Sequence, residues 1–350
     1  NGISVHENVF AHNIHRNPRV AGRQVRVTGN VMYNWSARAG STFKDVQIDW
    51  ERNIFKLGDM SSQSAILFHA TTDHLVTETY NAANGYEDPS LFLEGNIVPG
   101  YTEASPSRAQ METDNWKMLE DHYLDVPISQ SFRRTEKLAA AMFPALTEPA
   151  SPMALERKLL DAGSHSRLRC DGFWVWSRDE VDQRLVDDIR LGRGPASQTQ
   201  LMEDPASAGG YFEGTAWSSC NDSDGDGASD EWEDTNGLNA FESNDGLLDF
   251  DFDGYTNLEE YLNGTDPYLQ DTQDTRVTIT KTALSSEIVL SPSPLACGDD
   301  CNTLYFHEGQ KVTATFLRAG DFEVWEAGPC VGETSPQCSF VVEGAVTLAA

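Results

Sequence analysis

The chain has 350 residues, 39% of them hydrophobic, and a formal net charge of −30. This length is enough to bury a core and to hold two or three domains. No apolar run approaches the roughly 18 residues that a membrane-spanning helix needs, and the acidic balance makes nucleic acid an unfavourable partner. The charge is uneven. Residues 1–56 carry eight Lys and Arg against four Asp and Glu, whereas residues 220–274 carry seventeen acids and no base.

Repeated asparagines in the first hundred residues predict stacked coils of short strands. Asn8, Asn30, Asn53 and Asn96 each precede a short apolar segment, at spacings of 22, 23 and 43 residues. A period near 22 accommodates three short strands and three turns, which make up one coil of a parallel β-helix. Asparagine tolerates the left-handed backbone at a coil corner, and its amide can bond to the asparagines of adjacent coils. We therefore expect a partial right-handed parallel β-helix whose first coils precede Asn1.

Two short helices are predicted after an irregular stretch over residues 100–150, which we expect to form loops packed on the coils. Ser151-Pro152 marks the start of the first helix, and Gly163 marks its end. Residues 177–180 form a capping box that opens the second helix, and Gly192 ends it. The charges of the second helix are interpreted as a solvated face and not as a site.

Two acidic segments, 222–233 and 249–260, match the EF-hand calcium loop and lie 27 residues apart. The alternative is an acidic disordered linker. No long amphipathic helix enters either loop, which argues against a sensor that opens a groove, so we expect Ca²⁺ to stiffen a linker over residues 216–274. The predicted ligands are Asp222, Asp224, Asp226, the Ala228 carbonyl, Asp230 and Glu233 in the first loop, and Asp249, Asp251, Asp253, the Tyr255 carbonyl, Asn257 and Glu260 in the second.

Residues 275–350 alternate apolar and polar side chains, which predicts a small antiparallel β-domain. Its cysteines resemble those of disulfide-bearing β-repeats in bacterial surface and secreted proteins, and we expect a spacer or attachment module. Carbohydrate binding through Trp325 is the alternative to a core role for that residue. The six cysteines lack zinc-site spacing and so indicate disulfides in an extracytoplasmic setting. The expected pairs are Cys297–Cys301, Cys330–Cys338 and Cys170–Cys220.

The motif around Arg16 reads His15-Arg16-Asn17-Pro18-Arg19-Val20 and lies among the asparagine-led segments. This motif resembles the core motif of family 1 pectate lyases, in which an arginine followed by x-Pro-Arg abstracts a proton. The resemblance covers residues 1–215. The resemblance implies cleavage of α-1,4-polygalacturonate by Ca²⁺-assisted β-elimination, with Arg16 as the base. The family usually has a substrate-binding arginine three residues after the proline, where this chain has Ala21. We therefore expect Arg19 and Arg23 to bind substrate.

The resemblance also implies a secreted bacterial enzyme, and we expect a monomer. The basic residues 1–56 suit a polyanionic sugar. The family's primary calcium ligands belong to earlier coils, so the chain by itself is expected to lack part of the site. Three alternatives remain open. A polygalacturonase would need paired carboxylates, and no Asp cluster stands on the strands near Arg16. A pectin lyase would accept neutral methyl esters, which the basic stretch does not favour. A calcium-stiffened adhesin or carbohydrate-binding β-solenoid would have no activity.

Overall fold

The chain folds into two compact units. The first comprises residues 1–163 and 180–211, and the second comprises residues 164–179 and 212–350. The segment 164–179 thus belongs with the C-terminal part of the chain. The computed structural model describes residues 2–43, 45–63, 66–70, 88–121, 128–139, 149–163, 165–200, 219–271, 276–281, 288–292, 294, 296–297, 302–317 and 322–350.

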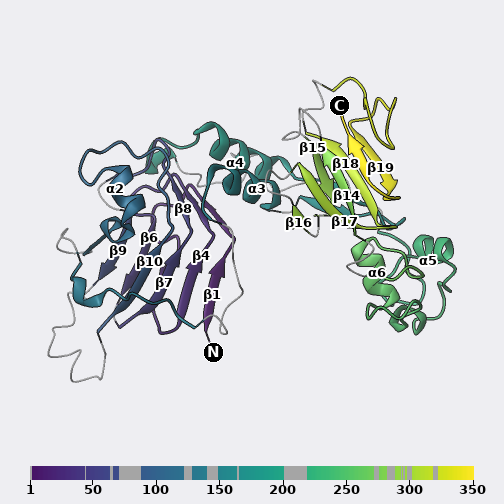
Figure 1. Cartoon of the computed structure of the whole chain (residues 1–350), viewed down its shortest axis with the longest axis horizontal. Coiled ribbons are helices and arrows are strands. Elements are labelled where there is room, and N and C mark those ends of the chain that lie inside the picture. The colour runs from purple at the N-terminus through teal and green to yellow at the C-terminus, as the bar shows by residue number, and fades with distance from the viewer. Residues whose placement is uncertain are drawn as a thin grey trace. The chain divides into compact units, whose positions relative to one another are not determined.

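The strands of the first unit form three parallel sheets. The first sheet contains β1 (Ile3–His6), β4 (Val25–Thr28), β7 (Gln47–Glu51) and β10 (Ser90–Glu94), which lie side by side in Figure 1. The second contains β2 (Val9–Ala11), β5 (Val31–Tyr33) and β8 (Ile54–Lys56). The third contains β3 (Arg19–Val20), β6 (Gly40–Phe43), β9 (Leu67–Ala70) and β11 (Leu119–Asp121). Consecutive strands therefore pass from one sheet to the next, and the prediction of a protein rich in β-structure is confirmed.

Each coil contributes apolar side chains to a shared interior. Val25 pairs with Ile3 in the coil before it and with Ile48 in the coil after it, and side chains alternate along each strand, so Val25 and Val27 point inward while Arg26 points outward. Because the register is kept from coil to coil, the inward residues form continuous stacks. Fully buried members of this core include Trp35, Ile48, Trp50, Phe55, Ile66 and Leu91.

A ladder of asparagine side chains joins the coils, as the repeat predicted. The side-chain amide of Asn8 donates to Asn30 Oδ1 at 3.0 Å, Asn30 donates to Asn53 at 3.0 Å, and Asn53 donates to Asn96 at 2.9 Å. The backbone N–H of each donor residue bonds to the same oxygen. Asn30, Asn53 and Asn96 are fully buried, so the ladder satisfies polar groups that water cannot reach.

The ladder has a fifth member that the sequence analysis missed. Asn96 donates to Asn115 Oδ1 at 3.0 Å, and Asn115 begins the 3₁₀-helix η1 (Asn115–Met118). The prediction of loops throughout 100–150 was also wrong, because α2 (Arg108–Thr113) precedes η1 and is opened by a capping box of Ser107 and Gln110. The 3₁₀-helix η2 (Gln130–Phe132) follows.

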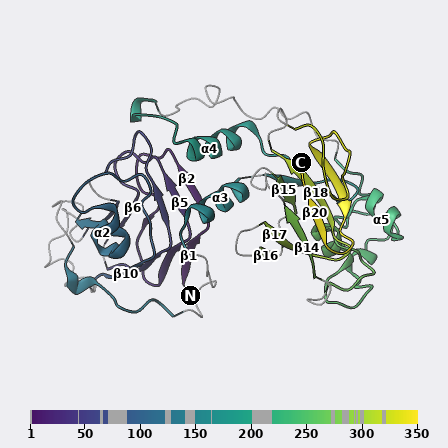
Figure 2. The same ribbon diagram turned by 45° about the horizontal axis from the view of Figure 1, so that its top comes forward.

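Two helices cover the outer face of the second sheet. They are α3 (Pro152–Asp161), whose N-cap is Ser151, and α4 (Glu180–Leu191). The bounds of α3 and the end of α4 follow the prediction, whereas α4 begins at Glu180 and not directly after Ser177, so the predicted capping box was wrong. Figure 2 shows α3 beside β2 and β5. The contact is apolar and consists of Val31, Tyr33 and Ile54 from the sheet with Ala154, Leu155, Leu159, Val186 and Ile189 from the helices. The 3₁₀-helix η4 (Gln198–Gln200) ends the described part of this unit.

The second unit contains a β-module and the acidic loops. One sheet has the order β16 (Ala296–Cys297), β17 (Thr303–His307), β14 (Arg276–Lys281) and β20 (Val346–Leu348), and another has the order β15 (Ile288–Ser291), β18 (Lys311–Phe316) and β19 (Gln337–Val341). The strand β12 (Ser166–Leu168) pairs with β13 (Trp174–Trp176). The pairings are antiparallel except that β14 and β20 run parallel.

Predictions about Trp325 and about the disulfides can be compared with the structure of this unit. Trp325 is fully buried among apolar side chains, which confirms the core role. The disulfides Cys170–Cys220 and Cys330–Cys338 are formed as predicted, whereas Cys301, and with it the predicted pair Cys297–Cys301, lies outside the described residues. In the described part of the chain, no helix is both long and apolar enough to cross a membrane.

Candidate functional site

Arg16 occupies a corner of the first coil, just before β3. Its backbone is left-handed, with φ 68°, a conformation that is uncommon for a residue with a Cβ, and its side chain is exposed. The flanking residues fix this corner. The N–H of the buried Asn17 donates to Ala39 O at 2.8 Å, and Pro18 O accepts from Ser41 N at 3.1 Å. The next coil thus holds the backbone on the C-terminal side of an arginine whose side chain faces solvent.

Further arginines lie around this corner on the third sheet. Arg19 in β3 is exposed and stacks on the Phe43 ring at 4.3 Å from its centroid. Arg38, which is bridged to His15 through its backbone, stacks on Phe68 at 4.7 Å. Stacking orients a guanidinium and leaves its charge in place. The predicted substrate residue Arg23 lies further along, with Nη1 at 4.0 Å from Asp45 Oδ2.

A buried charge network lies on the first sheet. Asp49 in β7 is fully buried, and it accepts from Arg134 Nη2 at 2.6 Å and from Leu138 N at 2.9 Å. Its strand neighbour Glu51 lies 3.1 Å from Arg26 Nε. Both carboxylates are therefore paired with cations. A pair of this kind is structural and differs from the two accessible carboxyl groups that a glycoside hydrolase requires.

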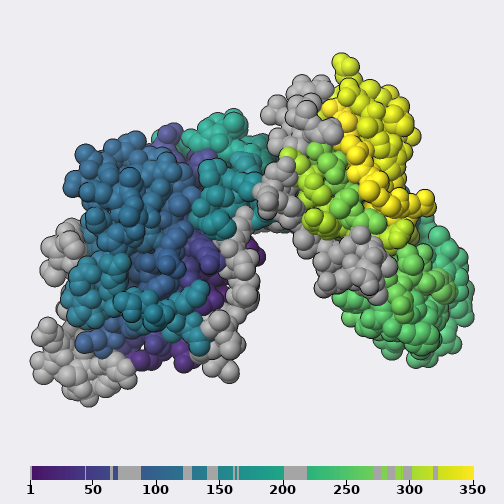
Figure 3. Space-filling model, in the orientation of Figure 1, coloured from purple at the N-terminus to yellow at the C-terminus, as the bar shows by residue number. Residues whose placement is uncertain are grey.

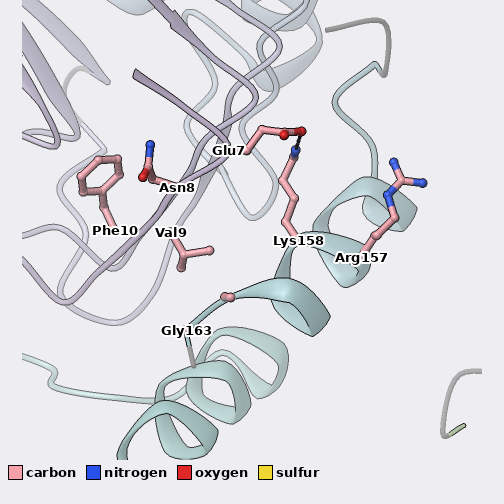
Figure 4. Close-up of a pocket in the computed structure, with 8 residues that line it drawn as sticks. Glu7, Asn8, Val9, Phe10, Arg157, Lys158 and Gly163 are labelled. Carbon is pink, nitrogen blue, oxygen red and sulfur yellow. Dashed lines mark hydrogen bonds and ion pairs between the residues drawn. The ribbon is translucent and has the colours of Figure 1, made fainter. Parts of the chain in front are cut away.

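A cavity of about 410 Å³ opens beside β2 and α3. Figure 4 shows the ion pair between Lys158 and Glu7, at 3.1 Å, in its wall. Its other lining residues are Asn8, Val9, Phe10, Arg157, Ala162 and Gly163. Arg16 does not line this cavity, so the cavity gives no support to a catalytic role for Arg16.

The two acidic loops have the same internal hydrogen bonds. The Asp222 carboxylate accepts from the N–H groups of Gly225 and Gly227, and Asp249 accepts from the equivalent positions in the second loop. Gly227 and Gly254 have φ values of 105° and 104°, a region that favours glycine. The loops lead into α5 (Asp230–Asn236) and α6 (Asn257–Asn263), and their segment forms the continuous green surface in Figure 3.

Carboxylates converge within and beside each loop. The ligand atoms of each of four groups lie within 4.8 Å of one another: Asp222, Asp224 and Asp226; Asp226, Glu233 and Asp245; Asp249, Asp251 and Asp253; Asp253, Glu260 and Asp271. Glu233 is fully buried and Glu260 is 1% exposed. Among the described residues, no hydrogen-bond donor reaches either oxygen of Glu233. The same is true of Oε1 of Glu260.

These buried acids suit a hard cation. Burial and the neighbouring aspartates raise the pKa of Glu233 to about 7 and that of Glu260 to about 8, because charged carboxylates are crowded together away from water. A divalent ion removes this repulsion and uses the unpaired oxygens. The donor set consists of oxygen alone, which is the preference of Ca²⁺, and the predicted cofactor therefore fits the residues present.

The residues at position 9 and at the two carbonyl positions form hydrogen bonds within the loop region. Both oxygens of Asp230 accept from Ser223, one from the backbone N–H and one from the hydroxyl, each at 2.7 Å. Asn257 donates its amide to Asp245 O at 2.7 Å, and its buried Oδ1 has no hydrogen-bond donor among the described residues. Ala228 and Tyr255 donate their N–H groups to Asp226 and Asp253. The ligand roles of all the predicted residues, including position 9 and the two carbonyls, stay predictions.

No family model matches the chain. It is similar to the "Probable pectate lyase C" of Aspergillus flavus and to that of Aspergillus oryzae, at 26% identity over 267 residues in each case. The chain is distantly similar to pectate lyases. The match covers 76% of this chain and 54% of each relative, so the chain spans about half the length of the curated relatives it matches.

Both relatives are fungal, and the bacterial origin expected from the sequence stays a prediction.

Proposed function

We propose that this chain is part of a secreted pectate lyase, and that its first unit is part of a right-handed parallel β-helix. The observation that carries the proposal is the motif at Arg16, which presents an exposed arginine on a corner held by the next coil. The distant similarity to pectate lyase C points to the same activity.

The proposed reaction is β-elimination on α-1,4-polygalacturonate. Arg16 removes the proton on C5 of a galacturonate, the C4–O bond breaks, and the electron pair of the C5–H bond forms the C4=C5 double bond. The leaving oxygen departs with the shortened polymer and takes up a proton. When bound, Ca²⁺ supplies Lewis acidity at the uronate carboxylate. We assign the ligands of that ion to no residue of this chain.

The cations near Arg16 have two proposed roles. Arg19 and Arg23 bind substrate carboxylates, and the stacking of Arg19 on Phe43 orients its guanidinium for this purpose. Arg38, in the next coil, adds positive potential at the corner, which favours the approach of a polyanionic substrate. A free guanidinium stays protonated far above pH 7, so we expect activity at alkaline pH.

The remaining parts are proposed as accessories of a monomeric, extracellular enzyme. Calcium stiffens residues 216–274, and the β-module over 275–350 acts as a spacer or attachment module. The two disulfides are consistent with an oxidising compartment.

The second candidate is a calcium-stiffened adhesin or carbohydrate-binding β-solenoid without activity. It requires only the stacked parallel sheets of the first unit and the converging carboxylates of the acidic loops. A hydrolase is less well supported, because Asp49 and Glu51 are held in ion pairs. The same fold could also serve a pectin lyase, which would act on methyl esters.

The test is the product released by the full-length natural protein from polygalacturonate at alkaline pH with added Ca²⁺. We expect ultraviolet absorbance from an unsaturated uronide, abolished by chelator. Reducing ends without absorbance would show a hydrolase, and absorbance only from methylated pectin would show a pectin lyase. Polysaccharide binding with neither signal would favour the adhesin.

A further inference from the structure

We propose that each calcium ion of the acidic loops is held by a carboxylate from outside its twelve-residue loop, Asp245 for the first and Asp271 for the second. The inference rests on calcium binding by the loops, which is part of the proposed function, and not on pectate cleavage. It adds two ligands that the loop pattern cannot contain.

The first site is completed by the segment that follows α5. Asp245 opens the 3₁₀-helix η6 (Asp245–Leu247), and its carboxylate lies within 4.8 Å of those of Asp226 and Glu233. Asp245 Oδ2 accepts from Asn239 N at 2.8 Å, which orients the side chain. Its Oδ1 is buried and, within the described structure, has no hydrogen-bond donor, and the same holds for Asp226 Oδ2 and for both oxygens of the fully buried Glu233.

Close packing supports this arrangement. A Cβ added to Gly246 would collide with the Asp226 carboxylate in its present position, so the backbone beside Asp245 lies directly against this side chain. Four unpaired, buried oxygens of three acids therefore face one another. Such a group is costly without a cation and is what a calcium ion with six to eight oxygen ligands requires.

The second site repeats the arrangement with the segment that follows α6. The side chain of Asp271 is 5% exposed, and its carboxylate lies within 4.8 Å of those of Asp253 and Glu260. The N–H of Asp271 donates to Asp253 Oδ2 at 2.7 Å, which ties the segment to the loop. Glu260 accepts from the Thr265 hydroxyl on one oxygen, while its other oxygen has no hydrogen-bond donor in the ranges described. Asp271 Oδ1 likewise accepts no hydrogen bond there and lies 3.7 Å from His307 Nδ1.

Position 9 adds no unpaired carboxylate to either loop. In the first loop the Asp230 carboxylate accepts from Ser223. In the second loop position 9 is the neutral Asn257, whose Oδ1 is buried and has no hydrogen-bond donor among the described residues. An acid from the following segment therefore provides the additional negative charge, and ligand charge is one of the factors that set calcium affinity. Each ion would thus have ligands from its loop, from the helix that follows the loop and from the segment after that helix, and would hold the three together.

The test is calcium titration of the full chain by calorimetry, after removal of bound metal, with the variants Asp245→Asn and Asp271→Asn. We expect the unmodified chain to bind two ions, and each variant to bind one of them at least about tenfold more weakly. The matched control is Asp234→Asn, which removes the same charge from an exposed position on α5 and should leave both affinities unchanged.

A second readout separates a ligand from a merely structural residue. Tb³⁺ luminescence lifetimes in H₂O and D₂O count the waters on the bound ion, and Asp245→Ala and Asp271→Ala should each add about one water where a carboxylate is lost. Circular dichroism of the metal-loaded variants checks folding. Affinities and water counts equal to those of Asp234→Asn would overturn the proposal. Absence of calcium binding by the unmodified chain would overturn it together with the structural calcium role. Normal calcium binding, with no uronide release by the full-length natural protein, would overturn the lyase alone.

Discussion

Removal of calcium is expected to destabilise the second unit, because the acidic loops are bonded to the β-module. The end of α6 makes the link. Gly264 O accepts from Lys311 N at 2.6 Å, and Leu262 O accepts from Trp174 Nε1 at 2.8 Å. The loop helices also share a core, in which the fully buried Trp232 contacts Tyr261 at 5.2 Å between ring centroids. A loss of order in either loop should therefore also destabilise the sheets of the β-module.

The size of the effect follows from mass action. An ion present at 100 times its dissociation constant stabilises the folded state by about 2.7 kcal/mol, so two sites supply about 5 kcal/mol. For a unit of this size, each kcal/mol shifts Tm by about 2–4 °C. Chelation should lower the Tm of the second unit by about 10–20 °C.

Differential scanning calorimetry in Ca²⁺ and in chelator measures this shift, with Mg²⁺ as the control ion. Magnesium should restore little of the lost stability, since it requires near-octahedral geometry and retains its waters. A shift below about 2 °C, or an equal shift in the transition of the first unit, would refute the structural role assigned to the loops.

Two further predictions concern the same two units. In chelator, the Tm of the second unit should fall as pH rises from 6 to 8.5. The pKa values of Glu233 and Glu260 are raised in the folded chain to about 7 and about 8, so the metal-free folded state binds protons more tightly than the unfolded state, and the resulting stability is lost as pH rises through these values. A Tm in chelator that is flat or rises over this range would contradict the crowding of these acids. In the first unit, Asn53→Ala should cost about 3 kcal/mol by chemical denaturation, because it removes the side-chain bonds to Asn30 and Asn96 and leaves the buried backbone N–H of Asn30 without its acceptor. The exposed Asn13→Ala is the control, and equal stabilities of the two variants would argue against the ladder as a source of stability.

Periodic features of this fold could be predicted from the sequence, because one coil repeats the chemistry of the last. The spacing of Asn8, Asn30 and Asn53 predicted both the parallel strands and the amide ladder, and end signals at Ser151 and Gly163 predicted α3. The acidic loops were recognisable for the same reason, since their ligands recur at fixed positions within twelve residues.

Features that depend on contacts between non-repeating segments were missed. Asn115 joins the ladder from a 3₁₀-helix, 19 residues after Asn96, which breaks the period. The signal for α2, a serine followed three residues later by glutamine, was present in the sequence and was overlooked. Asp245 and Asp271 lie outside the loop pattern, and only the fold brings them to Glu233 and Glu260. Nor does the sequence show that residues 164–179 pack with the C-terminal strands, where Trp176 O accepts from Gln337 Nε2 at 3.1 Å.

The proposed catalytic role of Arg16 is tested most directly by Arg16→Lys in the full-length natural protein, assayed for unsaturated uronide release from polygalacturonate with Ca²⁺. The matched control is Arg108→Lys, which changes an arginine that is 48% exposed on α2 and pairs with Glu112. A lysine lacks the planar fork and the reach of the guanidinium, so we predict that kcat falls at least about 100-fold while KM changes little and the control stays unaffected. A kcat for Arg16→Lys equal to that of Arg108→Lys would contradict the assignment of Arg16 as the base.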